Sequence, residues 1–404
     1  MSLPLLVAWR NLIHDPVRFG LYVGGITFAV VLIGVQYGIL QAMLESNVRL
    51  LECLDGDLVL IHPQRASVMF RAAFPRQRLE QARSVDGVHC VMPLYLDYQA
   101  GEWLATGVAR PQRGPARRIR VVGVDLQRNP LRTLNIPFQD WQRLQLPGTA
   151  LYDRWARPAP PPFAPTVYGP LHEGIQGELT GQKLTLVGDG FELGFDFAAD
   201  GTLIVSDRTF ARYLRANMAF TAKDPLDDID LGVIRCAADS SVATVQITLK
   251  KMFAAMPDVE VLTLSELIQR EKRFWLMNTP IGFAFGAGMI LGFIVGLVIC
   301  YQILTGNIAD HVGQYATLRA IGHGPAFLRA IVGAEALLLA GLGLTVGIAV
   351  VAAVQSVLTD WTAMPFRLPL QRVLALAGVT TTMCWLSARL AARHVEKVDP
   401  ADVF

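Results

Sequence analysis

The sequence predicts an α-helical membrane protein with four transmembrane helices (one plus three) and a large α+β extracytoplasmic domain inserted between helices 1 and 2. One uncharged apolar run lies between Arg18 and Glu45, and three more lie between Arg273 and Arg389. A polar block long enough for a folded domain separates the first run from the others. The 52% share of hydrophobic residues is too high for an ordinary soluble protein, and the mean hydropathy of +0.37 is too low for a fully embedded one.

The N-terminal part of the chain contains an amphipathic segment, residues 1–19, and the first predicted transmembrane helix, residues 20–44. A helix rises about 1.5 Å per residue, so about 20 residues cross roughly 30 Å of hydrocarbon. The apolar run is too long for the core of a secretory signal peptide, and no small-residue cleavage site follows it. A membrane span is therefore favoured over a cleaved signal.

The inserted domain, residues 45–274, is predicted to have a β-α-β piece at each end. These pieces cover residues 51–125 and 226–262, and we expect them to pair into one membrane-proximal subdomain. Residues 126–225 would form a distal subdomain. Cys90 and Cys236 lie in this domain, and either a disulfide between them or free thiols are compatible with their spacing.

A cluster of arginines in the inserted domain has no acidic neighbour between Gly107 and Gly123. Its members are Arg110, Arg113, Arg117, Arg118 and Arg120. A solvated hairpin is favoured here over a site for an anionic partner such as a lipid headgroup.

The remaining predicted transmembrane helices, numbers 2 to 4, cover residues 275–304, 331–358 and 372–389. The second is longer than a bilayer requires, which suggests that it tilts or projects from the membrane. Thr263 to Glu266 has the capping-box pattern of a helix start. We therefore expect one rigid helix from Thr263 through Phe274 into the second span.

Basic residues near the spans set the predicted orientation. Residues 1–19, the loop of residues 305–330 and the tail of residues 390–404 carry arginine or lysine, whereas Arg367 is balanced by Asp360 in the loop of residues 359–371. Both termini and the 305–330 loop are therefore expected in the cytoplasm. The inserted domain and the 359–371 loop would lie on the opposite, periplasmic side.

Glycines four residues apart recur in the spans, a pattern that lets helices approach closely. In the second span they are Gly288, Gly292 and Gly296, which we predict to form a helix-packing or dimer face. Packing within one chain and packing against a second copy both fit this pattern.

No sequence pattern indicates catalysis. The chain has no P-loop, no zincin motif, no nucleophile elbow and no Cys-x-x-Cys pair, and its histidines are dispersed. We expect no catalytic residue, no metal site and no cofactor bound by this chain, and the net charge of +2 gives no reason to expect a nucleic-acid partner. Glu335 is the only acid within a span, and we expect it to make a polar contact at a helix end rather than to serve a proton relay.

Several strings resemble one family of transport proteins. DHVGQYATLRAIG, from Asp310 to Gly322, resembles the cytoplasmic coupling element of MacB/FtsX-type ABC transporter permeases. AIVGAEALLL from Ala330 resembles the start of their third helix, and the final VDPADVF resembles their usual ending. A closer resemblance to the DevC subfamily, permeases of tripartite exporters, rests on LDGDLVLI from Leu54, FAADGTLIVSD from Phe197, NTPIGF from Asn278, and GFIVG from Gly292 with YQIL from Tyr301.

The resemblance implies the permease subunit of an ATP-driven tripartite ABC exporter of the mechanotransmission type in a bacterial inner membrane. The cargo would be an envelope lipid, a glycolipid or another hydrophobic compound. Expected partners are two cytoplasmic ABC ATPase subunits that bind ATP and magnesium, a second copy of the chain, a periplasmic adaptor (membrane fusion protein), a TolC-like outer-membrane channel, and membrane lipids. The alternative is an FtsX-like transmembrane signal transmitter or a lipoprotein-releasing permease.

The resemblance also implies an ATPase-coupling site. Its residues are His311, Gln314, Tyr315, Ala316, Thr317, Leu318, Arg319, Ala320, Ile321 and Gly322. Tyr315, Leu318 and Gly322 are spaced i, i+3 and i+7, which predicts one helical face that lies in a partner's groove. Gln314 stands where the motif usually has an acid, so an ion pair to the ATPase is lost there. Tyr315→Ala with Arg319→Glu is expected to abolish transport and leave the chain folded.

Overall fold

The computed structural model describes residues 3–106, 115–158, 166–168, 174–217, 224–362, 364, 366 and 368–395. Its internal contacts divide the chain into two compact units. The helical unit comprises Met1–Ala42, Pro280–Trp361 and Pro365–Phe404, and the inserted unit comprises Met43–Thr279 with Thr362–Met364.

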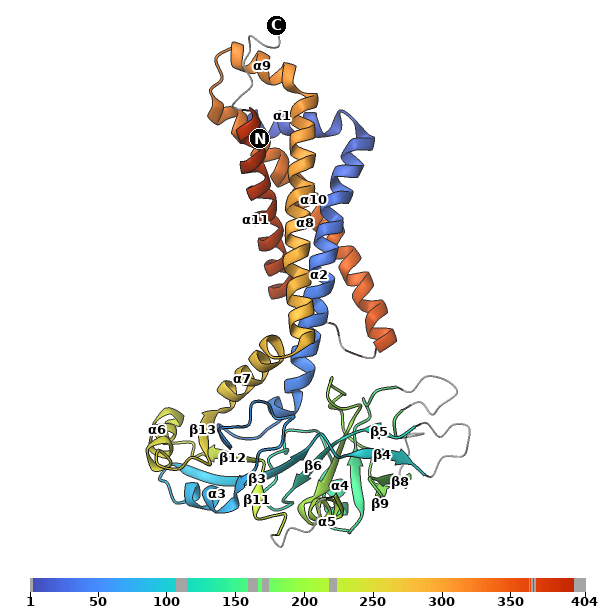
Figure 1. Cartoon of the computed structure of the whole chain (residues 1–404), viewed down its shortest axis with the longest axis vertical. Helices are drawn as coiled ribbons and strands as arrows, with labels where there is room; N and C mark the ends of the chain where they lie inside the picture. The colour runs from blue at the N-terminus through green and yellow to red at the C-terminus, as the bar shows by residue number, and fades with distance from the viewer. Residues whose placement is uncertain are drawn as a thin grey trace. The chain divides into compact units, whose positions relative to one another are not determined.

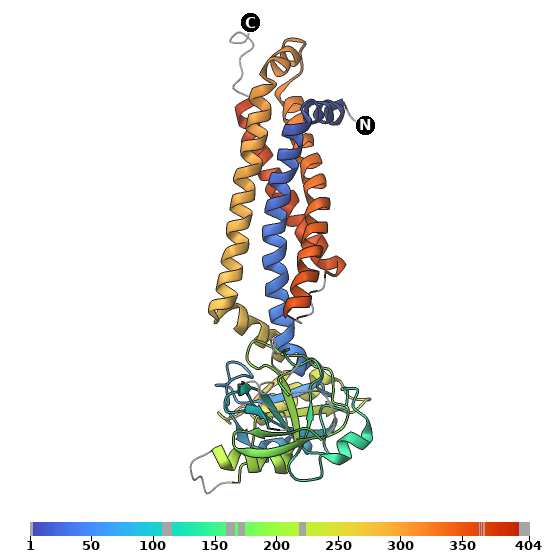
Figure 2. The same ribbon diagram turned by 90° about the vertical axis from the view of Figure 1, so that its right-hand side faces the viewer.

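Four helices of the described chain are long and apolar enough to cross a membrane. They are α2 (Pro16–Glu52), α8 (Pro280–Asp310), α10 (Pro325–Thr362) and α11 (Leu370–Val395). In the helical unit they run lengthwise beside one another, and α8 packs along α11 (Figures 1 and 2). The predicted fold class, one helix followed by an insert and three more helices, is confirmed.

Two short helices, α1 (Leu3–Ile13) and α9 (Val312–Ala320), lie at one end of the long helices (Figure 1). Leu12 of α1 and Tyr315 of α9 belong to the same buried core as Leu304 of α8 and Ile331 of α10. The loop predicted at residues 305–330 is therefore mostly helical, because α8 continues to Asp310 and α10 already begins at Pro325.

The predicted rigid helix from Thr263 into the second span is wrong. Helix α7 (Leu264–Met277) ends at Met277 with Asn278 as its C-cap, and α8 begins at Pro280 rather than at Trp275. Proline lacks the N–H that would bond to the preceding turn, and it disfavours helical geometry in the residue before it. A helix that crosses this position is thereby interrupted.

The predicted capping box at the start of α7 is confirmed. Glu266 N donates to Thr263 Oγ1 at 3.1 Å, and Thr263 N donates to Glu266 Oε2 at 2.7 Å. Two N–H groups that the helix leaves without partners are satisfied in this way.

The inserted unit is built on an 11-stranded sheet in the order β13-β1-β12-β3-β6-β10-β7-β9-β8-β4-β5. The strands are β1 (Leu58–Ile61), β3 (Val88–Asp97), β4 (Glu102–Ala105), β5 (Arg117–Arg118), β6 (Arg120–Val124), β7 (Thr149–Tyr152), β8 (Gln176–Leu179), β9 (Gln182–Leu186), β10 (Thr202–Ser206), β12 (Leu231–Cys236) and β13 (Glu260–Thr263). A separate pair joins β2 (Phe74–Pro75) to β11 (Asp228–Ile229). The helices are α3 (Arg76–Arg83), α4 (Phe138–Arg143), α5 (Asp207–Asn217), α6 (Val242–Met252) and α7.

The two β-α-β pieces interleave within this sheet. β12 of the second piece lies between β1 and β3 of the first and is antiparallel to both, while β13 pairs with the other side of β1. The resulting order, β13-β1-β12-β3, is that of the ferredoxin-like split β-α-β motif. The sequence placed β4 and β5 in the first piece (residues 51–125). Instead, β4 pairs with β8 among the distal strands, and β5 pairs with the other side of β4.

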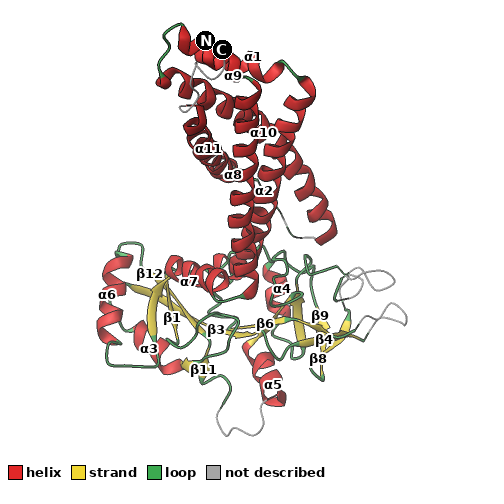
Figure 3. Ribbon diagram, turned by 45° about the horizontal axis from the view of Figure 1, so that its top comes forward, coloured by secondary structure: helices red, strands yellow, loops and turns green. Residues whose placement is uncertain are grey.

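Helices and loops cover both faces of the sheet. One buried cluster includes Leu79 of α3, Phe210 of α5 and Leu249 of α6. The cluster on the other face includes Leu50 at the end of α2 and Leu267 of α7. Figure 3 shows α5 and α7 on opposite sides of the strands. The unit is therefore a sheet buried between two layers, which explains its fully buried strands.

The five cysteines are free thiols. In the pairing of β3 with β12, Cys90 lies opposite Arg235, whereas Cys236 lies opposite Val88. Cys236 packs into the core on one face of the sheet and Cys90 against the core on the other. Their side chains point to opposite faces, so neighbouring strands do not bring the two sulfur atoms together.

Arg117 and Arg120, two of the described members of the arginine cluster, have separate structural roles, whereas Arg118 is exposed on β5. Arg117 pairs with Asp200 at 3.4 Å. Arg120 is 1% exposed and donates to Asp196 Oδ2 at 2.6 Å and to the Tyr98 hydroxyl at 3.2 Å. Arg110 and Arg113 lie outside the described residues. Arg120 is therefore part of the core of the inserted unit and does not take part in an exposed anion-binding patch.

Candidate functional site

Helix α9 has a well-defined C-terminal stop. Gly322 follows it with a φ of +100°, a conformation that favours glycine. Gly322 N donates to Arg319 O at 3.0 Å, and His323 N donates to Leu318 O at 3.1 Å. These are the two backbone bonds of a Schellman motif. Gly322 therefore terminates the helix and does not extend the helical face of Tyr315 and Leu318.

The α9 face predicted to lie in a partner's groove is turned into the helical unit. Tyr315 is 2% exposed and sits in the core, and Leu318 packs against the same core. Tyr315→Ala would remove a buried aromatic side chain, a change that typically costs 3–5 kcal/mol for phenylalanine or tryptophan. The variant is therefore expected to be destabilised, and whether it leaves the chain folded stays a prediction.

A different row of α9 is open to solvent. Gln314, Thr317 and Ile321 also have the i, i+3 and i+7 spacing, and Ile321 is 72% exposed. Of the ten predicted coupling residues, Gln314, Thr317, Ala320, Ile321 and Gly322 are exposed, His311, Leu318 and Arg319 are half-buried, and Tyr315 and Ala316 are buried. We call Gln314, Thr317 and Ile321 the outer row.

Glu335 is the centre of a buried polar node that joins four helices. Its carboxylate accepts hydrogen bonds from Asn11 Nδ2 of α1 at 3.1 Å and from Asn307 Nδ2 of α8 at 2.9 Å. The Tyr315 hydroxyl of α9 donates to the same carboxylate at 3.5 Å. A buried carboxylate is costly without such donors. The node therefore ties α9 to α1, α8 and α10.

The Tyr315 hydroxyl is a hydrogen-bond donor in this arrangement. Burial, and then the negative charge of Glu335, raise the pKa of Tyr315 well above its ordinary value. The phenol therefore stays protonated throughout the physiological range.

An outer ion pair lies beside the node. Arg18 at the start of α2 pairs with Asp310, the last residue of α8, and also contacts Asp15 at 3.3 Å. Asp15 Oδ1 accepts the backbone N–H groups of Val17 and Arg18, so it also caps α2. Because Arg18 is 53% exposed, solvent screens the pair, and we expect it to orient the helix ends more than to stabilise them.

Sequence reasoning identified Glu335 and Tyr315 but missed their partners. Asn11 and Asn307 each lie near an apolar stretch, and this position was the only sign in the sequence that they make buried polar contacts. The two asparagines are 296 residues apart in the chain, and only the fold shows that they share one carboxylate.

The three glycines of the second span face α2 of the same chain. A Cβ atom on Gly288 would overlap the Gln36 side chain. One on Gly296 would overlap Met383 of α11 and come within 2.7 Å of Ala29 Cβ of α2. Gly292 likewise lies against α2. These positions allow α8 and α2 to pack closely, and a role in a dimer stays a prediction.

No metal site is present among the residues that the structure describes, where no three His, Cys, Asp or Glu side chains are grouped to hold an ion. The polar groups at the node hold four helices together.

Part of the helical unit is similar to a known protein family. Residues 286–400, from α8 through α11, match the family described as FtsX-like permease C-terminal. This part of the chain therefore belongs to the FtsX-like permease C-terminal family. The comparison with curated protein sequences found no match.

Two solved structures resemble part of this chain. The periplasmic region of MacB from Actinobacillus actinomycetemcomitans is 9% identical, with a TM-score of 0.37 over 54% of this chain and 94% of that one. The extracellular domain of the noncanonic ABC-type transporter YknZ from Gram-positive bacteria is 12% identical, with a TM-score of 0.33 over 51% of this chain and 98% of that one.

Proposed function

We propose that this chain is an FtsX-like permease, the membrane subunit of an ATP-driven exporter, with both termini and α9 in the cytoplasm and the inserted unit in the periplasm. Two copies would pair with two cytoplasmic ATPase subunits, which bind ATP and magnesium. An adaptor and an outer-membrane channel would complete the assembly. The DevC-like strings favour an envelope lipid, a glycolipid or another hydrophobic compound as cargo.

The observation that carries the proposal is the way in which α9 is held. Its inner face is fixed by Tyr315 and the Glu335 node, while Gln314, Thr317 and Ile321 face outward. A helix docked in this way passes a push on its outer row to the helices behind it. The exposed apolar side chain of Ile321 suits a groove on a partner protein.

The force would then travel along α8 and α10. Asn307 ties α8 to the node, and Glu335 belongs to α10 itself. α8 follows α7 of the inserted unit after two linking residues, Asn278 and Thr279. We infer that movement of α8 is passed to the inserted unit through this short connection.

Photo-crosslinking in native membranes tests the contact. A photoreactive amino acid at Thr317 or Ile321 should capture a P-loop ATPase, which mass spectrometry identifies. Thr382, exposed on α11, is the matched control and should not capture the ATPase. Equal capture from Thr382, or none from either α9 position in cells with intact transport, would contradict the coupling proposal.

Mild-detergent purification of the tagged chain tests the larger assembly. An ATPase together with a coiled-coil periplasmic adaptor would support the tripartite exporter. An ATPase without an adaptor would favour the signal transmitter or the lipoprotein-releasing permease.

A further inference from the structure

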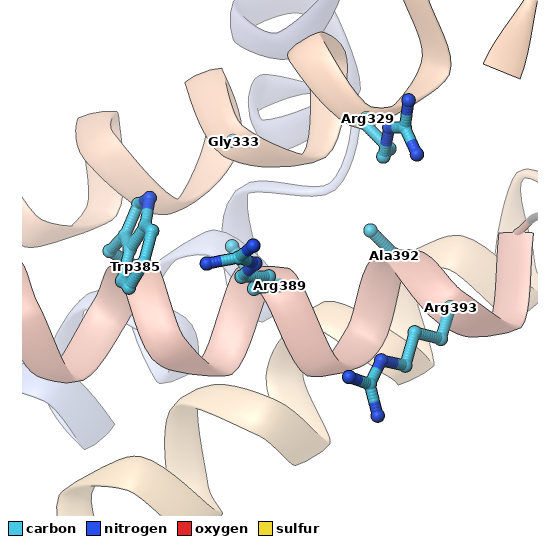
Figure 4. A pocket seen from close by; sticks show the side chains of 7 residues that line it. Arg329, Gly333, Trp385, Arg389, Ala392 and Arg393 are labelled. Carbon is cyan, nitrogen blue, oxygen red and sulfur yellow. The ribbon is translucent and has the colours of Figure 1, made fainter. Parts of the chain in front are cut away.

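A basic cavity lies between α10 and α11, away from the Glu335 node. Its volume is about 390 Å³, and it is lined by Arg329 and Gly333 of α10 and by Trp385, Arg389 and Arg393 of α11, with Ala388 and Ala392. The small residues leave room, and the arginines supply charge. Figure 4 shows Trp385 and Arg389 on the side of α11 that faces α10. We propose that this cavity binds the phosphate headgroup of an anionic phospholipid.

The electrostatics of the cavity favour an anion. Three of the seven lining residues are arginines, and none of the seven, all within the described part of the chain, is acidic. The Arg389 guanidinium lies 5.0 Å from the Trp385 ring centroid, a cation–π contact that holds it in place. Guanidinium groups bind phosphate oxygens through paired, charge-assisted hydrogen bonds.

The apolar neighbours favour a lipid over a free phosphate ion. Arg329, Gly333 and Leu337 follow one another at four-residue steps on α10, and Leu337 is 60% exposed. On α11, Trp385 is 54% exposed and lies one turn further into the span than Arg389. The charged groups thus lie near the helix ends and the apolar groups deeper, which matches a headgroup followed by acyl chains.

Gly333 makes the size of the cavity testable. A Cβ atom added there would meet no atom within 4 Å, so a larger side chain would extend from open space. Gly333→Leu keeps every charge and reduces the cavity. The proposal takes from the proposed function only the side of the membrane, and its test requires neither an ATPase nor transport.

The experiment measures lipid binding to the full chain in detergent. Dioctanoyl phosphatidylglycerol is titrated, with dioctanoyl phosphatidylcholine and inorganic phosphate as separate arms. Arg329→Gln and Arg389→Gln should each weaken phosphatidylglycerol binding by about tenfold, as expected for one lost charged hydrogen-bond partner. Gly333→Leu should weaken it as well. Arg10→Gln, which removes an exposed charge from α1, should leave it unchanged.

Three results would overturn the proposal. If Arg10→Gln weakened lipid binding as much as Arg389→Gln, the lipid would be attracted to positive charge in general. Loss in the arginine variants with none in Gly333→Leu would place the lipid outside the cavity. Inorganic phosphate that binds as tightly as the lipid would make this a site for free anions. Unchanged thermal unfolding of each variant establishes that the chain stays folded.

Discussion

At the scale of single residues, Glu335 shows how this chain accommodates a carboxylate within an apolar helix. Its side chain is fully buried, and it accepts from Asn11, Asn307 and Tyr315. Glu335→Leu would leave Asn307 and Tyr315 buried without their acceptor, at about 1–3 kcal/mol for each unsatisfied group, and would also remove the partner of the half-buried Asn11. We expect a lower melting temperature of the detergent-solubilised chain and faster hydrogen exchange in α9.

Glu335→Gln is the matched control for this prediction. Glutamine keeps the shape and one acceptor oxygen, so part of the network survives and the losses should be smaller. If leucine and glutamine at position 335 gave the same melting temperature and α9 exchange as the parent, the node would not hold α9.

Asp153 in the inserted unit gives a pH-dependent prediction. Burial raises its pKa from 3.8 to about 6, while the backbone N–H groups of Leu193, Trp155 and Gly194 act in the opposite direction. Between these values the folded chain binds more protons than the unfolded chain, so stability falls as pH rises. A shift of about 2 units corresponds to a loss of stability of about 3 kcal/mol, which is absent below pH ~4 and complete above pH ~7.

Hydrogen exchange of the full chain at Leu193 and Gly194 measures this effect, because both amides donate to Asp153. After correction for intrinsic rates, their protection should decrease from pH 5 to pH 7. Asp153→Asn should lower protection at every pH but remove this slope. A slope that persists in Asp153→Asn would assign the pH dependence to another group.

At the scale of elements, substitutions of two glycines in and after α9 are expected to have opposite effects on its stability. Gly322 has a φ of +100°, so Gly322→Ala should strain the stop of α9 and destabilise it by about 1 kcal/mol. Gly313 lies within α9, and an added Cβ there would meet no atom within 4 Å. Gly313→Ala should therefore stabilise the helix by roughly 0.5–1 kcal/mol.

Amide exchange in α9 of the full chain distinguishes the two variants. Protection should fall in Gly322→Ala and rise in Gly313→Ala. Changes of the same sign in both would mean that helix propensity at these positions does not control the stability of α9.

The sequence predicted those elements whose signal is local. Apolar runs located the four long helices, and Thr263 with Glu266 located the start of α7. The end of α7 could also be predicted, because Pro280 interrupts a helix. The uncharged run that begins at Trp275 instead favoured one continuous helix. The exposed face of α9 could not be predicted from the sequence. The i, i+3 and i+7 spacing fits both the row of Tyr315 and the adjacent row of Gln314. Only the burial of Tyr315 in the core decides between them.

At the scale of the whole molecule, the arginines near the helix ends were used in the sequence only to set orientation. The fold adds that Arg329 and Arg389, 60 residues apart, line one cavity. No local pattern brings two helix ends together, so a site of this kind is found only after the helices are packed. The same residues can set topology during insertion and bind lipid afterwards.

The orientation itself gives the last prediction. If the arginine distribution sets topology, Thr317 of α9 and Leu146 of the inserted unit face opposite sides of the membrane. Both positions are exposed, and because the five native cysteines are free thiols, a cysteine-free background breaks no crosslink. In intact cells permeabilised only at the outer membrane, a charged maleimide should label Leu146→Cys but not Thr317→Cys. Disruption of the inner membrane should make Thr317→Cys reactive. Labelling of both before disruption, or of Thr317→Cys alone, would contradict the predicted topology and the placement of α9 beside a cytoplasmic ATPase.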